Sequence, residues 1–226
     1  MEDRFKGGIQ LELLGGFNLG GPLGSKTTAL GRKAAGLLAI LAVSSGGSLS
    51  RDRIAGLLWS GRDDTLARNS LRQTLTVLRR ALGPSVDDAL EFGRIAIGLR
   101  GGSLRCDVLE FTERIRGGQL AEAVDLYRGP FLDGFFIRDS SFEEWSAGER
   151  RRLHDIYVEA LEVLVEQETG RGRAVLARRL VAADPLRESA HQLLIEALAK
   201  AGARDEALRQ FRELQDLYDR ELGVGV

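Results

Sequence analysis

The feature that most constrains the fold is the stretch Thr65–Leu82, TLARNSLRQTLTVLRRAL. Leucine recurs there at helical spacing, at Leu71, Leu75, Leu78 and Leu82. The same stretch contains four arginines and no acidic residue. A helix that buries leucine and presents Arg, Asn, Gln and Thr on its free side carries the residue types that hydrogen-bond to base edges. The stretch therefore predicts a helix that reads duplex DNA.

The polar residues of this helix share one face opposite the leucines. The members of that face or its borders are Arg68, Asn69, Arg72, Gln73, Thr76, Arg79 and Arg80. We expect Asn69, Arg72, Gln73 and Thr76 to face bases, because Arg pairs with guanine, Asn and Gln pair with adenine, and Thr can meet a thymine methyl. Arg68, Arg79 and Arg80 are expected to hold phosphates. A polar face can also be merely solvated, but such a face usually mixes Glu with its Arg.

Charge is divided unevenly along the 226 residues, although the formal net charge is only −1. Met1–Cys106 has fifteen Lys and Arg against nine Asp and Glu, and the remainder has seventeen against twenty-four. A basic front half and an acidic back half suggest two domains with different partners. The glycines at 101 and 102 mark the expected linker, so we predict domains at 1–102 and 103–226.

The front half predicts a small sheet, three helices and a terminal hairpin. Apolar and polar residues alternate around Ile9–Leu13, the run RKAAGLLAILAV from Arg32 predicts a core helix, and Ser50 is a good N-cap for the next helix. Phe92, Ile95 and Ile97 surround Gly93–Arg94, which favours a hairpin. This order describes a winged helix-turn-helix, whose third helix enters the major groove.

The back half predicts a purely α-helical domain, so the chain as a whole is expected to be mostly α. Amphipathic stripes cover five segments, separated at Gly129–Pro130, Gly170, Asp184–Pro185 and Gly202. The spacing is typical of tetratricopeptide-like helical hairpins. Such arrays commonly bind proteins in a concave groove, but the helices can also serve only packing and self-association.

Four residues outside the leucine-striped helix are weaker candidates for DNA contacts. Ser50 and Arg51 stand at the start of the second predicted helix, where exposed N–H groups can bind a phosphate. Lys33 in the first helix and Arg94 in the hairpin are further cations that could reach the duplex.

Several other functions have little support in the residues. His154, His191 and the single Cys106 have no partners at metal-ligand spacing, so no metal or other cofactor is expected. Cys106 lacks an identifiable base, and no carboxylate pair predicts acid–base catalysis, so we expect no enzyme. No secretory segment or apolar run of about 18 residues is present, so a cytoplasmic protein acting at the nucleoid, away from the membrane, is expected.

Blocks along nearly the whole chain carry a family resemblance. They include LELLGGFNL, RKAAGLLAILA, LSRDRIAGLLW, RNSLRQTLTVLRRAL, LYRGPFLDGF, FEEW, ERRRL, AADPLRESAHQLLIEALAKAG and ALRQFRELQDLYDRELGV. Together they resemble the Streptomyces antibiotic regulatory protein family, in which an OmpR-like winged helix precedes a bacterial transcriptional activator domain. The resemblance implies an activator that binds promoter direct repeats as two protomers and recruits RNA polymerase through its sigma factor.

The resemblance also makes the loop between the second and third helices a candidate polymerase contact. Its charged residues are Arg62, Asp63 and Asp64. The loop can equally be a connecting turn in which Asp64 or Thr65 caps the next helix. The chain departs from the family at Ser60, where a Pro often follows the Trp, and at Gly31, where a capping Thr is common. Relatives commonly continue past the point that corresponds to Val226.

Two rival interpretations remain open on the residues alone. In the first, the winged helix no longer binds DNA and the chain is a protein-interaction module of a larger signalling protein. In the second, the chain is the regulatory front end of a larger cyclase or ATPase. Salt-dependent duplex binding distinguishes the first rival from a DNA-binding regulator, and the length of the native reading frame tests the second.

Overall fold

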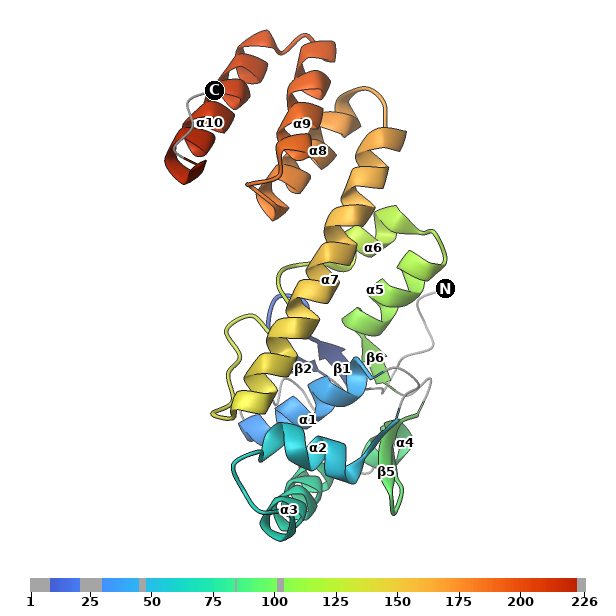
Figure 1. Cartoon of the computed structure of the whole chain (residues 1–226). Coiled ribbons are helices and arrows are strands. Elements are labelled where there is room, and N and C mark those ends of the chain that lie inside the picture. Colours follow the sequence, from blue (N-terminus) through green and yellow to red (C-terminus); the bar gives the residue numbers. More distant parts are fainter. Residues whose placement is uncertain (1–8, 21–29, 45–47, 84, 101–103, 223–226) are drawn as a thin grey trace. The chain divides into compact units, whose positions relative to one another are not determined.

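A computed structural model describes residues 9–20, 30–44, 48–83, 85–100 and 104–222. The fold is mostly helical with two small sheets, as predicted (Figure 1). The strands are β1 (Ile9–Glu12), β2 (Asn18–Gly20), β3 (Ser48–Ser50), β4 (Leu90–Phe92), β5 (Ala96–Leu99) and β6 (Leu104–Cys106). The helices are α1 (Arg32–Ala42), α2 (Arg51–Leu58), α3 (Asp64–Leu82), α4 (Ser85–Ala89), α5 (Asp107–Arg116), α6 (Leu120–Leu126), α7 (Ser140–Gln167), α8 (Arg171–Ala183), α9 (Glu188–Lys200) and α10 (Arg204–Leu222).

The chain forms two compact units, which are described separately. The first combines Met1–Gly117 with Asp125–Leu153, and the second combines Gly118–Val124 with His154–Val226. Helices α6 and α7 therefore each contribute to both units. No helix among the described residues is both long enough and apolar enough to span a bilayer.

The first unit contains both sheets. One has the strand order β2-β1-β6, with β1 antiparallel to β2 and parallel to β6. The other has the order β3-β5-β4 and is antiparallel throughout, which confirms the predicted hairpin between β4 and β5. Helix α1 is almost entirely buried, and the leucine-striped helix α3 packs against α1 and α2.

The predicted boundary after residue 102 differs from the division into compact units. Strand β6 completes the sheet of β1, and the carboxylate of Asp107 accepts hydrogen bonds from the backbone N–H groups of Leu13 and Leu14, each at 2.9 Å. Burial raises the pKa of Asp107, and these backbone hydrogen bonds oppose the rise. Strand β6 and the start of α5, which follow the predicted boundary, are therefore structural parts of the N-terminal unit.

A second segment from the acidic half also packs on the N-terminal helices. The peptide of Leu14 forms a bridge with Phe131, and Phe131, Ile137 and Phe142 are buried. A Cβ added at Gly36 of α1 would clash with Cδ1 of Ile137 unless that side chain shifted, so α1 and this segment approach closely at the glycine. We call residues 127–142 the docking segment.

The second unit is built from helices α8, α9 and α10 with the adjoining parts of α6 and α7. Helix α9 packs against both α8 and α10. Polar contacts join other parts of the unit: Arg187 lies 2.8 Å from Glu162 of α7, and Arg179 of α8 donates to the carbonyl of Val124 in α6 at 2.8 Å. His191 is buried, with Nε2 2.9 Å from the Pro185 carbonyl and Nδ1 3.0 Å from Nε2 of Gln210. Gly170 and Gly202 have positive φ angles at two of the predicted breaks.

Candidate nucleic-acid interface

Helix α3 has the amphipathic character that its sequence predicts. Its buried residues are Ala67, Leu71, Leu75, Leu78 and Leu82. The N-cap is Asp63, whose Oδ1 accepts a hydrogen bond from the backbone N–H of Leu66 at 3.0 Å, so the expected cap at Asp64 or Thr65 was wrong by one or two positions. The helix ends at Gly83, whose φ of 62° suits a residue without a side chain.

All seven polar candidates on α3 are exposed, opposite the buried stripe. They are Arg68, Asn69, Arg72, Gln73, Thr76, Arg79 and Arg80. Within this set, Nη1 of Arg72 donates to Oδ1 of Asn69 at 2.9 Å, and the Thr76 hydroxyl donates to the Arg72 carbonyl at 3.1 Å. The bond to Asn69 holds Arg72 beside it on the exposed face of the helix.

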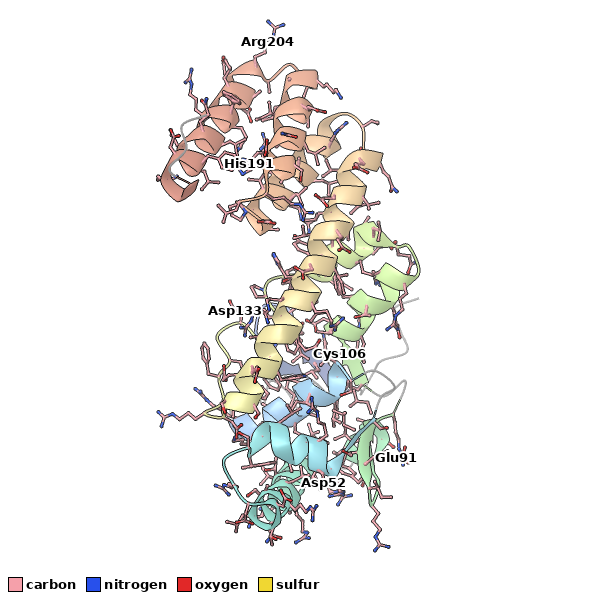
Figure 2. The ribbon with its side chains drawn as sticks, viewed as in Figure 1. Asp52, Glu91, Cys106, Asp133, His191 and Arg204 are labelled. Carbon is pink, nitrogen blue, oxygen red and sulfur yellow. The ribbon has the colours of Figure 1, made fainter. Side chains whose placement is uncertain are left out.

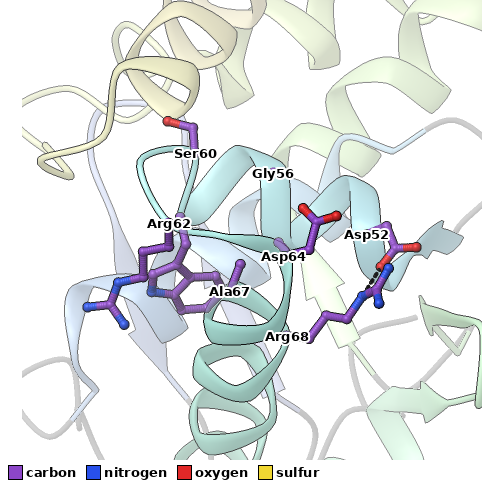
Figure 3. A pocket seen from close by; sticks show the side chains of 9 residues that line it. Asp52, Gly56, Ser60, Arg62, Asp64, Ala67 and Arg68 are labelled. Atoms are coloured by element: carbon purple, nitrogen blue, oxygen red, sulfur yellow. Dashed lines mark hydrogen bonds and ion pairs between the residues drawn. The ribbon is translucent and has the colours of Figure 1, made fainter.

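The arginines at the border of this face have carboxylate partners. Nε of Arg68 lies 2.8 Å from Asp52, which raises the pKa of Arg68 (Figure 3). Arg79 lies 3.9 Å from Asp87, and its guanidinium stacks 3.9 Å from the Phe92 ring centroid in β4. Exposed ion pairs of this kind are weak, so phosphates can replace the carboxylates. For Arg80, the described part of the chain offers no such carboxylate.

The turn between β4 and β5 is fixed by Arg51. The backbone N–H of Arg51 donates to the Ile95 carbonyl at 2.9 Å, and its Nε donates to the Gly93 carbonyl at 3.0 Å. The Ser50 hydroxyl accepts from the Arg53 N–H at 3.2 Å and caps α2. Ser50 and Arg51, the two candidate phosphate contacts, therefore also stabilise the local fold, whereas Arg94 is exposed at the turn.

Lys33 is placed differently from the expected phosphate contact. Its ammonium donates to the Leu58 carbonyl, lies 3.4 Å from a carboxylate oxygen of Asp139, and lies 5.6 Å from the Trp59 ring centroid. Burial lowers the pKa of Lys33, and the Asp139 carboxylate opposes that effect. Lys33 thus ties α1 to the end of α2, because these contacts occupy its ammonium group.

The loop between α2 and α3 is held by a residue that the sequence analysis missed. Asp139, in the docking segment, accepts from the backbone N–H of Ser60 at 3.1 Å and from its hydroxyl at 2.7 Å. No local pattern could have identified it, since 79 residues separate the partners. Arg62 donates to the Ser70 hydroxyl at 2.7 Å, and Asp63 caps α3. Asp64, the third candidate polymerase contact, is exposed.

An open pocket of about 200 Å³ lies between α2, this loop and α3. Its charged lining residues are Asp52, Arg62, Asp64 and Arg68 (Figure 3). The pocket mixes both signs of charge, and Asp52 and Arg68 neutralise each other. Among the residues that the structure describes, no group of three or more His, Cys, Asp or Glu side chains could hold a metal ion.

Cys106 should resist alkylation in the folded protein. Its side chain is 1% exposed, and burial raises its pKa to about 12, so the reactive thiolate is scarce at neutral pH (Figure 2). Native and urea-unfolded samples treated with iodoacetamide at pH 8 and analysed by mass spectrometry check this. Rapid labelling of the native protein would contradict the burial of β6 against β1.

Comparison with known proteins identifies the family. The model for the bacterial transcriptional activator domain matches residues 110–226, which is more than half of the chain. The chain belongs to this family. The match begins inside α5, so the docking segment lies within the matched region although it packs in the N-terminal unit.

The chain is also similar to a regulatory protein in sequence and to a solved structure in fold. The regulatory protein AfsR of Streptomyces coelicolor is 29% identical over 199 residues, covering 83% of this chain and 20% of AfsR. The structure of Mycobacterium tuberculosis EmbR in complex with a low affinity phosphopeptide aligns with a TM-score of 0.68 at 20% identity, covering 97% of this chain and 62% of EmbR. The chain spans only about a fifth of AfsR. The expected membership of the Streptomyces antibiotic regulatory protein family, a family of transcriptional regulators, is confirmed.

Proposed function

We propose that this chain is a sequence-specific DNA-binding transcriptional regulator in which α3 enters the major groove. The observation that carries the proposal is the face of α3: seven exposed polar residues, four of them arginines, stand opposite a buried leucine stripe, and no acidic residue occurs from Thr65 to Leu82. Helices α1 to α3 and the β4–β5 hairpin form a winged helix, with Arg94 at the tip of the wing reaching toward the backbone or minor groove.

The residues of α3 divide into two roles. Asn69, Arg72, Gln73 and Thr76 contact base edges from the centre of the face. Arg68, Arg79 and Arg80 contact phosphates from its borders and its far end, with Arg68 and Arg79 exchanging their carboxylate partners for DNA. Ser50 and Arg51 contribute to phosphate binding through the N-terminus of α2 and the wing, which they hold in place. Lys33 is not part of the interface, because its ammonium group already contacts the Leu58 carbonyl and Asp139.

Membership of the family supports a transcriptional role. The chain activates by binding promoter direct repeats as a dimer and recruiting RNA polymerase with its sigma factor, and Arg62, Asp63 and Asp64 form the polymerase contact. The second unit is a tetratricopeptide-like domain for self-association and protein partners. The protein has no catalytic activity and works at the nucleoid in the cytoplasm.

Selection of bound duplexes from a random pool tests the proposal, followed by titration of the enriched sequence over a series of salt concentrations. We expect an enriched direct repeat whose affinity falls steeply with salt, because each phosphate contact releases a counterion. Absence of enrichment together with absence of binding at low salt would favour a protein-interaction module of a larger signalling protein.

Arg80→Ala should weaken binding to all duplexes by a similar factor. Arg80 is exposed at the C-terminal end of the α3 face, where a cation serves a phosphate rather than a base. The slope of log K against log salt should fall by about one. Arg212→Ala, which removes an exposed arginine from α10, is the control. A loss confined to one base position would reassign Arg80 to base reading.

A further inference from the structure

Helix α3 exposes two large apolar side chains. Leu66 is 53% exposed and Val77 is 45% exposed. Eleven residues, close to three helical turns, separate them, so they lie on one edge of the helix. Gln73 follows Leu66 by seven residues, about two turns, and therefore lies next to this edge within the base-reading face. We call Leu66 and Val77 the apolar edge of α3.

The apolar edge is distinct from the buried stripe. The helix packs against α1 and α2 through its leucines, about a third of a turn away from the edge. Beside the edge, the Ser70 hydroxyl donates to the Leu66 carbonyl and accepts from Arg62. The side chains next to Leu66 are therefore polar. The helical spacing places Leu66 and Val77 beside the base-reading face, where both are exposed.

The two edges of the exposed face differ in chemistry. Arg68 and Arg79 form the other edge, also eleven residues apart, and both have carboxylate partners. Asn69, Arg72, Gln73 and Thr76 lie between the edges. Phosphates can replace the carboxylates at the arginine edge. A helix face with an arginine edge, a polar centre and an apolar edge is then complementary to a major groove that has phosphates on its wall and base edges on its floor.

We propose that Val77 and Leu66 read the C5-methyl groups of thymines, next to a Gln73 that pairs with adenine. This inference rests on the proposed function. DNA is the favoured occupant because α3 has four arginines and no acidic residue from Thr65 to Leu82, which makes this face complementary to a polyanion, and because the thymine methyl is the one apolar group that base pairs present in the major groove. The operator should therefore carry A·T pairs where the apolar edge lies.

Replacing single thymines of the selected operator with deoxyuridine tests this, because the exchange removes only the methyl group. At the contacted positions, wild-type protein should bind about fourfold more weakly per methyl, the effect of burying one carbon. Val77→Ala should bind the thymine and uracil duplexes equally at its position, and Leu66→Ala should do so at another. Leu208→Ala, which removes a 55% exposed leucine from α10, should keep every wild-type penalty.

Three outcomes would overturn the inference alone, and a fourth would overturn the proposed function with it. If wild-type protein binds its operator specifically and tolerates every uracil, the apolar edge reads no methyl, while the proposed function stands. If the penalties persist in both variants and vanish in Thr76→Ser, the Thr76 methyl is the reader. If both variants keep the uracil penalties and instead lose polymerase-dependent transcription, the edge contacts protein. Loss of all specific binding by wild type would reject the proposed function as well.

Discussion

Replacing Arg72 and Gln73 together with alanine should weaken binding to the selected operator by at least about 30-fold while leaving weak, salt-dependent binding to unrelated duplexes. A bidentate pair with the correct base contributes about 1 to 3 kcal/mol of discrimination, so two pairs contribute roughly 2 to 6 kcal/mol. Both side chains are exposed and opposite the leucine stripe, so their loss leaves the core intact. Fluorescence anisotropy with operator and scrambled duplexes at the same salt concentration measures the effect.

The matched control is Arg152→Ala/Gln192→Ala, which removes the same residue types from exposed positions on α7 and α9. It should keep operator preference and lower the net charge by the same amount. A double variant in α3 that retains the full ratio of operator to scrambled affinity would show that α3 is not the recognition helix. An equal loss on both duplexes would instead assign Arg72 to a phosphate.

Sequence alone was enough for α3 because its signals are local. The leucine spacing specifies which face is buried, Gly83 ends the helix, and the polar residues on the opposite face are exposed as predicted. The hairpin of β4 and β5 and the cap at Ser50 were also predictable, since turn residues and capping residues act within a few positions of the chain. Whether the exposed face binds DNA stays a prediction.

The features that escaped prediction depend on contacts between distant parts of the chain. Nothing near Leu104 indicates a strand parallel to β1, because that pairing joins residues 95 positions apart. The sequence predicted a free cation at Lys33, because its partner Asp139 lies 106 positions later in the chain. The position of Arg51 at the start of a helix suggested a phosphate contact, yet its guanidinium donates to the carbonyl of Gly93. In each case tertiary packing decides which polar groups remain available to a ligand.

Phe142→Ala should destabilise the first unit by about 3 to 5 kcal/mol, the usual cost of truncating a fully buried phenylalanine. Phe142 is 0% exposed, its ring centroid lies 5.3 Å from that of Trp145 and 6.1 Å from that of Phe135, and Cε2 lies 3.2 Å from the position of a Cβ on Gly36. In the variant, the contact between Phe142 and Gly36 is lost, so the docking segment should detach from α1. Chemical denaturation followed by tryptophan fluorescence measures the loss of stability, because Trp145 lies next to the space that the truncated Phe142 side chain leaves.

Phe136→Ala provides the control, because Phe136 is 57% exposed in the same segment and its truncation should change stability by no more than about 0.5 kcal/mol. Equal stability of the two variants would show that the docking segment does not pack on α1.

The destabilisation of Phe142→Ala also has a functional consequence. Because the docking segment supports α1 and holds Ser60 through Asp139, operator binding by Phe142→Ala should fall with the unfolded fraction, although Phe142 lies outside α3. A variant that unfolds the first unit yet binds the operator with full affinity would mean that residues 127–142 are dispensable for placing the recognition helix.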